Sequence, residues 1–547
     1  MLLGVNHDVP NHDQLQLNET LSTFPFIWIA LSGRDTIAKV DSVTGSVLGE
    51  YWSAPDGMGG NPSRTTVDLN GNVWAGNRDE DSGGKGSAVH IGLNETNQCV
   101  DRNGNGVIDT STGLGDVRPW SNPGGVDNNG GVSSAEDECL INYVRVNGRN
   151  TRTVAVDANN DAWIGGHNLS DEFDHDLVRP TSAGNGTILK SISPDCGGYG
   201  GLIDGSGVLW SADMTSGRLL RYDPSTDTAT CIDLGMHYSY GLGIDGAGNI
   251  WNSHWDYDSV HKISPAGTIL GTFPLPSGCH RGVAVTLVDQ NVWVANSCAD
   301  QVDRLTNDGT LVAAIPVGGT PTGVAVDAAG KVWVTNLGSD NAMRIDPATN
   351  AVDLTVDLGA GAAPYNYSDM TGTVSRAITA PQGTWPVIFD SGKAGSHWGT
   401  VSWNTENAPP CPPTPEEREP PGTSISARAR SAETIAGLGA ATYVDAPNGV
   451  DINPPDGRYL QVEVKLSTSV QGISPTVCDV AVSTAPTPAA EPVGGVAELP
   501  QTTGPEAATS EAASTNYALW QGIAAGSAAG AIVLVSAAWY TRRRWLR

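Results

Sequence analysis

Basic residues are scarce in this chain of 547 residues, which has 30 lysines and arginines against 59 aspartates and glutamates and a formal net charge of -29. So acidic a protein repels phosphate backbones, which argues against a nucleic-acid partner and makes cations such as calcium suitable ones. Charged residues make up only 16%, whereas there are 67 glycines, 34 prolines and 16 tryptophans. This composition argues against a helical bundle and is typical of an all-β protein with many turns.

The spacing that usually marks a zinc site is also absent, because no two cysteines form a CxxC pair. The eight cysteines fall into four local pairs in sequence order, which suits disulfides in an oxidising compartment. Other connectivities remain open from the sequence alone. The expected pairs are Cys99 with Cys139, Cys196 with Cys231, Cys279 with Cys298, and Cys411 with Cys478.

The first residues, MLLGVNHDVPNHDQ, contain neither the basic nor the apolar region of a signal peptide, so we interpret the start as truncated or misassigned. Residues 518–540 carry no charge and are long enough to cross a bilayer of roughly 30 Å as a helix. We predict one transmembrane helix at 517–541, with the arginine-rich tail 542–547 in the cytoplasm and the bulk outside. The alternatives are a buried helix and a tail anchor on a cytosolic protein.

A repeated phrase defines the expected fold: an alternating strand, an Asp turn with Gly or Asn, and a strand that opens with Trp. Its tryptophans are Trp28, Trp74, Trp163, Trp210, Trp251, Trp293 and Trp333. They are separated by 46, 89, 47, 41, 42 and 40 residues. Treating residues 94–141 as an insertion in blade two restores a period of forty-odd residues, which predicts a seven-bladed β-propeller over 23–372.

The first copy of the phrase lacks its innermost strand, and residues 363–372 align with the start of the last copy. We expect this stretch to complete the blade of Trp28 and close the ring. The repeat resembles NHL and streptogramin-lyase (virginiamycin B lyase)-like propellers over about residues 25–372. Because enzymes, scaffolds and ligand binders share such propellers, the resemblance implies the fold and leaves the activity open.

The start of each innermost strand and the end of each Trp strand emerge on the same face of the ring. The residues expected to face a ligand there are Arg152, Tyr199, Tyr240, Arg281, Tyr365, Asn77, Asn296 and Asn336. Arginines and tyrosines in a polar ring suit a polar or anionic ligand such as a sugar. The alternative is that these side chains only close loops at the rim.

Streptogramin lyases, as the resemblance implies, place a glutamate at the end of such a Trp strand, near a histidine and a magnesium ion. No glutamate occupies that place in this chain. Asp213 and His254 are the candidates for a substitute catalytic pair, with magnesium only if the chain is such a lyase. The missing glutamate favours a binding protein over an enzyme.

The insertion contains DRNGNGVID, the front half of a calcium loop, in which oxygen ligands alternate around a glycine turn. A bond between Cys99 and Cys139 would bring a later acidic stretch beside it. The predicted ligands of a structural calcium are Asp101, Asn103, Asn105, Val107, Asp109 and Glu138. The position of the last EF-hand ligand holds Thr112, and a solvated turn is the alternative.

The remaining regions change in composition. Residues 1–22 are expected to be irregular, 373–482 to form a β-sandwich, and 483–516 to be a Pro/Ala/Thr-rich stalk. In the stalk, LPQTTG resembles the LPxTG wall-sorting signal with an extra threonine. We therefore expect a membrane-anchored surface protein that binds a glycan or a protein, with attachment to the cell wall as a second mode of anchoring. The alternatives are a metal-assisted lyase and a structural surface-layer component.

Overall fold

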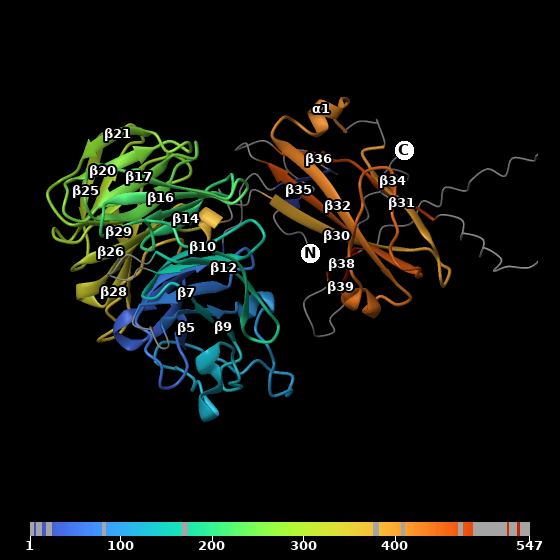
Figure 1. Ribbon diagram of the computed structural model, residues 1–547, viewed down its shortest axis with the longest axis horizontal. Coiled ribbons are helices and arrows are strands. Elements are labelled where there is room, and N and C mark those ends of the chain that lie inside the picture. Colours follow the sequence, from blue (N-terminus) through green and yellow to red (C-terminus); the bar gives the residue numbers. More distant parts are fainter. Residues whose placement is uncertain are drawn as a thin grey trace, which may run out of the picture. The chain divides into compact units, whose positions relative to one another are not determined.

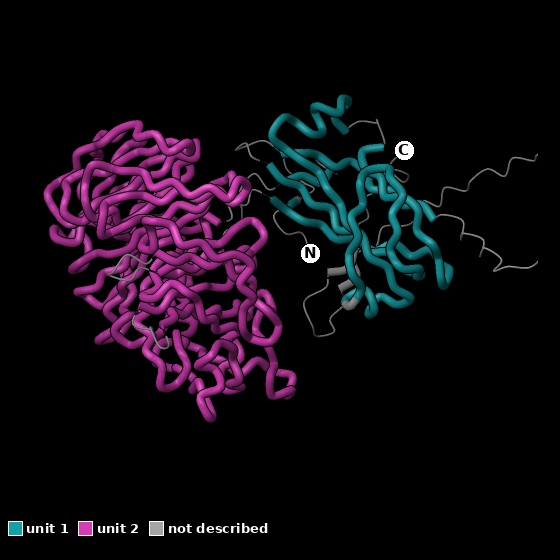
Figure 2. The backbone as a smooth tube through the Cα atoms, in the orientation of Figure 1, with its two compact units in different colours: residues 1–20, 382–547 teal, residues 21–381 magenta. Residues whose placement is uncertain are grey.

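The computed structural model describes residues 5–6, 14–17, 24–78, 84–166, 173–375, 382–405, 411–468, 474–484, 522–524 and 533–535. The chain divides into two compact units (Figure 2). One is Leu21–Pro381, and the other combines Met1–Thr20 with Gln382–Arg547. The predicted propeller, 23–372, falls inside the first unit.

The first unit contains seven antiparallel sheets in sequence order, which are the blades of the predicted propeller (Figure 1). Blade one comprises β3 (Phe26–Leu31), β4 (Thr36–Asp41) and β5 (Val47–Trp52). Blade two comprises β6 (Pro62–Val67), β7 (Val73–Asn77), β8 (Gly86–Ile91) and β9 (Leu140–Val146). Blade three comprises β10 (Thr151–Val156), β11 (Ala162–Gly166), β12 (His175–Pro180) and β13 (Gly186–Ile192).

The other four blades repeat the same antiparallel order. Blade four comprises β14 (Gly201–Ile203), β15 (Leu209–Ala212), β16 (Arg218–Asp223) and β17 (Thr228–Asp233). Blade five comprises β18 (Ser239–Ile244), β19 (Ile250–His254), β20 (Ser259–Ile263) and β21 (Ile269–Pro274). Blade six comprises β22 (His280–Val285), β23 (Val292–Asn296), β24 (Gln301–Leu305) and β25 (Leu311–Pro316). Blade seven comprises β26 (Pro321–Val326), β27 (Val332–Asn336), β28 (Asn341–Asp346) and β29 (Ala351–Asp357).

The repeated phrase has a physical basis in the hairpin that joins the first two strands of a blade. In blade seven, one carboxylate oxygen of Asp327 accepts hydrogen bonds from the backbone N–H groups of Ala329 and Lys331 in the turn. The other oxygen accepts the indole N–H of the fully buried Trp333 at 2.8 Å. Asp204 and Trp210 repeat the indole bond in blade four, also at 2.8 Å. The Asp therefore satisfies both the turn and the one polar atom of the buried indole.

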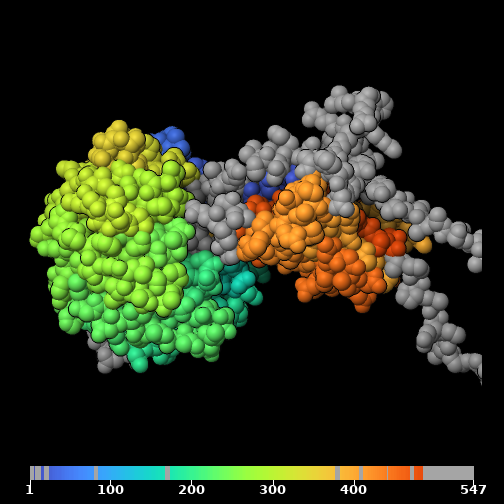
Figure 3. Space-filling view, turned by 90° about the horizontal axis from the view of Figure 1, so that it is seen from above, coloured from blue at the N-terminus to red at the C-terminus, as the bar shows by residue number. Residues whose placement is uncertain are grey.

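The ring closes through residues 363–372, as predicted, but these residues form an irregular strap. Leu31 and Pro364 form an isolated antiparallel bridge, and the N–H of Trp28 donates to the carbonyl of Met370 at 3.0 Å. Ala363 and Ser368 have positive φ values of 42° and 77°, which interrupt the extended backbone that a continuous ladder requires. In Figure 3, the blue start of the propeller lies beside its yellow end.

The insertion leaves blade two intact because it lies between β8 and β9. It contains the 3-10 helices η3 (Asn94–Thr96) and η4 (Pro123–Asn129), and its Trp120 belongs to an apolar core shared with residues of blades one and two. The Trp120 indole donates to Asp127 at 2.9 Å and packs edge-on against Tyr143. All four predicted disulfides are formed, including the Cys99–Cys139 bond that ties the two ends of the insertion together.

The second unit is a sandwich of two sheets that share one apolar core. One sheet has the order β30 (Gln382–Asp390), β35 (Tyr459–Thr468), β32 (Thr423–Ala432), β33 (Val444–Asp445). The other has the order β34 (Val450–Asp451), β31 (Trp398–Trp403), β37 (Val480–Thr484). The short helix α1 (Pro415–Arg418) follows Cys411, whose bond to Cys478 staples this unit.

The expectation that residues 1–22 are irregular needs a correction. Strands β1 (Val5–Asn6) and β2 (Leu15–Leu17) pair with each other, and β2 also pairs with β36 (Thr476–Val477). The side chains of Val5, Leu15 and Leu17 are buried in the sandwich core. This burial of apolar surface explains why the two ends of the chain fold together, outside the propeller.

The predicted transmembrane helix at 517–541 falls mostly outside the described residues, as do most of the stalk and the whole tail 542–547. Two parts of it are described, β38 (Gly522–Ala524) and β39 (Val533–Val535), which pair as antiparallel strands. At these six positions the backbone is extended where a helix was predicted, in keeping with the β-branched residues present. In the described parts of the chain, no helix is long and apolar enough to span a bilayer.

Candidate functional site

Four tyrosines converge at one end of the propeller channel. Tyr199 precedes β14, Tyr240 lies in β18, and Tyr365 and Tyr367 belong to the closing strap. The phenol oxygens of Tyr199 and Tyr365 are 3.1 Å apart, and those of Tyr240 and Tyr367 are 2.6 Å apart. The Tyr240 and Tyr365 phenols are also hydrogen-bonded to each other. Tyr365 is the partly exposed member, whereas the other three are buried.

Four arginines surround this tyrosine cluster. Nη1 of Arg281 donates to the Tyr367 phenol at 3.2 Å, and Nη1 of Arg152 donates to the Tyr199 phenol at 3.4 Å. The guanidinium carbon of Arg78 lies 4.3 Å from the ring centroid of Tyr365. The guanidinium carbon of Arg64 lies 3.7 Å from the ring centroid of Tyr367. We call this constellation, Arg64, Arg78, Arg152 and Arg281 with Tyr199, Tyr240, Tyr365 and Tyr367, the mouth cluster.

The mouth cluster concentrates positive charge in a strongly acidic protein. Within the described residues, the hydrogen bonds of its arginines go to carbonyl, amide and phenol oxygens, and none of the four is ion-paired with a carboxylate. Arg64 is fully buried, and its Nη1 and Nη2 atoms have no hydrogen-bond partner in the described part of the chain. Buried guanidinium groups without an acid beside them are costly unless an anion compensates them.

The charges act on one phenol in particular. Burial alone would raise the pKa of Tyr365, but the guanidinium charges of Arg281, Arg152 and Arg64 lower it to about 7. Burial raises the pKa values of the Tyr199, Tyr240 and Tyr367 phenols, and the charge on Tyr365 raises them further. Burial and the nearby Arg152 charge lower the pKa of Arg78. Near neutral pH, the cluster therefore favours one phenolate and three neutral phenols.

Sequence analysis anticipated Arg152, Tyr199, Tyr240, Arg281 and Tyr365 in this region, and the structure brings these five together. It missed Arg64, which lies one residue after the position that Arg152 and Arg281 share in their blades. The sequence contained a signal for Arg64. The matching position holds Thr153 in blade three and a glycine in blades four to seven, so an arginine there is unusual. It also missed Tyr367, which the irregular strap turns into the cluster beside Tyr365.

The side-chain amides of the predicted asparagines donate to neighbouring groups other than the phenols. The side-chain amide of Asn77 donates to the carbonyl of Ser53 at 2.8 Å. The amide of Asn296 donates to Asp303 at 3.1 Å, and that of Asn336 donates to Asn341 at 2.8 Å. These contacts match the alternative in which rim residues close loops.

Asp213 and His254 do not form a pair. The Asp213 carboxylate accepts hydrogen bonds from the backbone N–H groups of Thr215 and Ser216 in its own loop. The His254 imidazole is 2.7 Å from the His261 ring, and burial and the His261 charge lower its pKa to about 4. Magnesium prefers several oxygen ligands in octahedral array, and of these two side chains only the Asp213 carboxylate supplies oxygen atoms.

In the predicted calcium loop, side-chain oxygen atoms accept hydrogen bonds from the backbone N–H groups of the loop. The two carboxylate oxygens of Asp101 accept the N–H groups of Gly104 and Gly106 at 2.7 and 2.9 Å. Glu138, brought beside the loop by the Cys99–Cys139 bond, accepts the N–H groups of Asn103 and Asp109 at 3.1 and 2.9 Å. In the described residues, no three His, Cys, Asp or Glu side chains are grouped to hold a metal.

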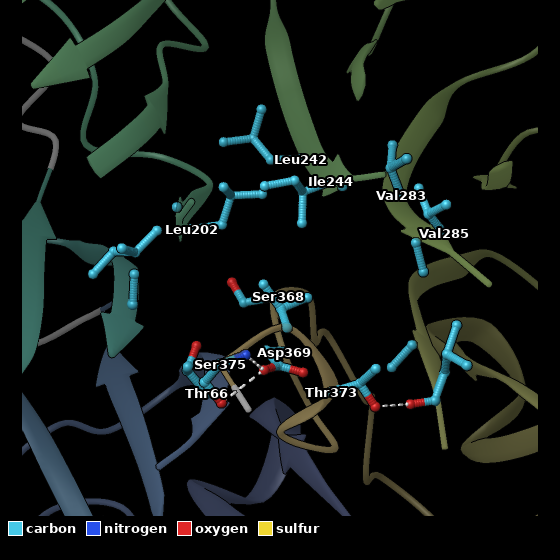
Figure 4. A pocket seen from close by; sticks show the side chains of 18 of the residues that line it. Thr66, Leu202, Leu242, Ile244, Val283, Val285, Ser368, Asp369, Thr373 and Ser375 are labelled. Carbon is cyan, nitrogen blue, oxygen red and sulfur yellow. Dashed lines mark hydrogen bonds between the residues drawn. The ribbon is translucent and has the colours of Figure 1, made fainter. Parts of the chain in front are cut away.

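Beyond the mouth cluster, the same inner strands line a cavity of about 620 Å³, counting the part open to solvent (Figure 4). Its wall is mostly apolar, with Leu202, Leu242, Ile244, Val283 and Val285 among the lining side chains. The strap and the residues just after it supply its polar side, where Ser375 donates to Asp369 of the strap at 3.0 Å. The arginines that could select an anionic ligand are thus gathered at the mouth of the channel, and none of them lines the cavity.

No known family model matches this chain, and no curated protein matches its sequence. Among solved structures, virginiamycin B lyase from Staphylococcus aureus is 15% identical, covers 58% of this chain and 92% of its own, and has a TM-score of 0.41. A functionally unknown protein from Desulfotomaculum acetoxidans is 12% identical. The match covers 63% of this chain and 98% of that protein, with a TM-score of 0.45. Kuenenia stuttgartiensis hydrazine synthase is 13% identical. The match covers 58% of this chain and 92% of that chain, with a TM-score of 0.41. Likenesses at this level concern the fold alone, and we take no residue role from them.

Proposed function

We propose that this protein is a cell-surface binding or adhesion protein that holds an anionic ligand, such as an acidic glycan, at the mouth cluster. The observation that supports this most is the convergence of Arg64, Arg78, Arg152 and Arg281 without a carboxylate partner in the described part of the chain. An anion supplies the missing counter-charge, and guanidinium groups bind carboxylates through paired hydrogen bonds.

Aromatic faces at the same place favour a sugar as the carrier of that anion. The guanidinium carbon of Arg281 lies 4.2 Å from the ring centroid of Trp255 and 5.1 Å from that of Tyr365. Flat aromatic surfaces beside fixed polar groups are a common combination in ligand sites. A sugar with one carboxylate would meet both features, its charge on the arginines and its ring against Tyr365.

The surface location rests on separate features. Four disulfides indicate an oxidising, extracellular environment for both units. Residues 518–540 and the arginines after them have the composition of a membrane anchor with a cytoplasmic tail, and the stalk would hold the folded units away from the membrane. LPQTTG is the candidate signal for attachment to a wall.

A screen of the full chain against acidic and neutral glycans tests this proposal. We expect binding to glycans that carry uronic acids, and little binding to the same backbones after carboxyl reduction. Because the attraction is electrostatic, binding should weaken as salt rises. Equal binding to the acidic and the reduced forms, or binding to none of them, would contradict the proposal.

We also propose a structural calcium in the insertion, held by Asp101, Asn103, Asn105, Asp109, Glu138 and the carbonyl of Val107. Alternating oxygen atoms on a glycine turn suit this ion, with the carboxylate of Glu138 beside the loop. At a free calcium concentration of about 100 times the Kd, binding of the ion would stabilise the folded state by about 2.7 kcal/mol.

Removal of calcium by a chelator is therefore expected to lower the melting temperature by several degrees, because the stabilisation from binding is lost. Calorimetry with calcium and with the chelator measures the difference. Glu138→Gln should remove most of the response. Glu136→Gln should keep it, because that carboxylate is hydrogen-bonded to Ser121 and Ser134. Identical melting with calcium and with the chelator in the unmodified protein would refute the ion.

A further inference from the structure

The hydrogen bonds among the four phenols can be counted. Three bonds join them, between Tyr199 and Tyr365, Tyr240 and Tyr365, and Tyr240 and Tyr367. Each bond uses one proton, so the fourth proton of four neutral phenols has no acceptor among these phenols. With Tyr199, Tyr240 and Tyr367 as the donors, every bond is made and the Tyr365 oxygen only accepts.

The guanidinium groups agree with this direction. Arg281 donates to Tyr367 and Arg152 donates to Tyr199, so each of these phenols accepts a bond from an arginine and can pass its own proton toward Tyr365. The side chains that face Tyr365 from the surrounding elements are Arg281 of β22, Arg152 of β10, Arg64 of β6, Arg78 after β7, Tyr240 of β18, Tyr199 before β14 and Tyr367 of the strap. The charged groups in this set are all arginines.

A deprotonated Tyr365 would balance one of the four arginine charges, and an incoming carboxylate would compete with it for the same arginines. We propose that Tyr365 is a phenolate in the ligand-free protein and takes up a proton when a carboxylate ligand binds at the mouth cluster. This rests on the proposed function and specifies how the same site is regulated. The proton comes from solvent and completes the Tyr365 hydroxyl, while the ligand carboxylate replaces the phenolate as partner of the arginines.

The coupling fixes the direction of the pH dependence. The ligand favours the protonated form of Tyr365, so protonation and binding support each other. Below the pKa of about 7 the phenol is already neutral, and affinity should be independent of this group. Above that pKa the proton must be taken up on binding, so affinity should fall by up to about tenfold per pH unit.

The first test is an ultraviolet titration of the full chain, which follows tyrosinate from about pH 5 to about pH 9. Of the 13 tyrosines, one is expected to ionise with a midpoint near 7. Tyr365→Phe should abolish that step, because the ring stays but the ionising group is gone. Tyr222→Phe should leave it unchanged, because the Tyr222 phenol donates to Asp227 in the outer part of blade four. Absence of a tyrosinate step near neutral pH would overturn the proposal.

The second test adds glucuronate, with glucose as the neutral control, at about pH 8, where the phenolate predominates. Glucuronate should remove the tyrosinate absorbance, and calorimetry in two buffers of different ionisation enthalpy should show uptake of close to one proton. Glucose should do neither. Tyr365→Phe should bind glucuronate without proton uptake and with an affinity that no longer changes between about pH 6 and pH 8.

The outcomes separate the two proposals. If glucuronate binds the unmodified protein without loss of tyrosinate, the coupling is wrong and the binding function stands. If the tyrosinate step is present but glucuronate gives neither heat nor a spectral change, the assignment of a carboxylate to this site is wrong. If Tyr365→Phe shows the same proton uptake as the unmodified protein, another group titrates and Tyr365 is not the coupled residue.

Discussion

Replacement of both Arg152 and Arg281 by alanine is expected to weaken binding of an acidic ligand by at least about 100-fold. Each arginine would give a charged hydrogen bond to the ligand carboxylate, and such bonds contribute about 1.5–3 kcal/mol each. Two of them amount to at least about 3 kcal/mol, which is more than two orders of magnitude in Kd. Calorimetric titration of the full chain with a uronate-bearing glycan measures the loss.

The control for this double replacement is Arg179→Ala, which removes an arginine whose side chain is 56% exposed and ion-paired with Asp161 in blade three. Affinity should stay within a factor of about two, because Arg179 lies in the third strand of blade three and contacts no residue of the mouth cluster in the described part of the chain. The melting temperature of the double variant must also stay near that of the unmodified protein. We expect this because the phenols can form hydrogen bonds with one another after the two cations are removed. A double variant that binds as tightly as the unmodified protein would place the ligand elsewhere.

Trp333→Ala is expected to destabilise the propeller by about 3–5 kcal/mol, the usual cost of truncating a large buried aromatic side chain. The indole is fully buried among residues of blades one and seven, including Ile29, Val40 and Ala342. Its loss also leaves the Asp327 carboxylate without the indole donor, in a buried place that already raises its pKa. Denaturant unfolding of the full chain measures the change as a lower midpoint for the propeller.

Trp333→Phe is the matched variant, because it keeps most of the apolar volume and removes the indole N–H. Its cost should be smaller, about 1–3 kcal/mol, since the main loss is the hydrogen bond to Asp327. If Trp333→Ala and Trp333→Phe lower the free energy of unfolding equally, the tryptophan does not stabilise the ring by packing between blades one and seven. If alanine costs less than about 1 kcal/mol, the tryptophan is not a core residue of the ring.

Much of the propeller could be predicted because a strand with a buried tryptophan recurs in every blade, and in blades two to seven a short hairpin precedes it. The Asp turn and the Trp strand come within a few residues of each other, so their spacing in the sequence reports the blades directly. The four disulfides could be paired for a similar reason, since each joins cysteines that are neighbours in sequence order. The pairing of β2 with β36 was missed because it joins segments more than 450 residues apart, which no local pattern records.

The candidate site was only partly predictable. Alignment of the blades placed Arg152, Arg281 and three tyrosines on one face, but it could not show which way a long side chain turns. Arg64 reaches the cluster from a position that the alignment assigns to small residues, and the asparagines donate to neighbouring groups other than the phenols. The state of Tyr365 depends on three guanidinium charges from three different blades, which meet only in the folded ring.

The most direct measurement is a structure of the full chain with glucuronate. The ligand carboxylate is expected within hydrogen-bond distance of Arg152 and Arg281, with the sugar ring against Tyr365 and the Tyr199–Tyr365 contact of 3.1 Å retained or lengthened. Glucuronate bound in the apolar cavity, in the sandwich unit or on the outer blades, with the mouth cluster unchanged, would contradict an anion site at the channel mouth.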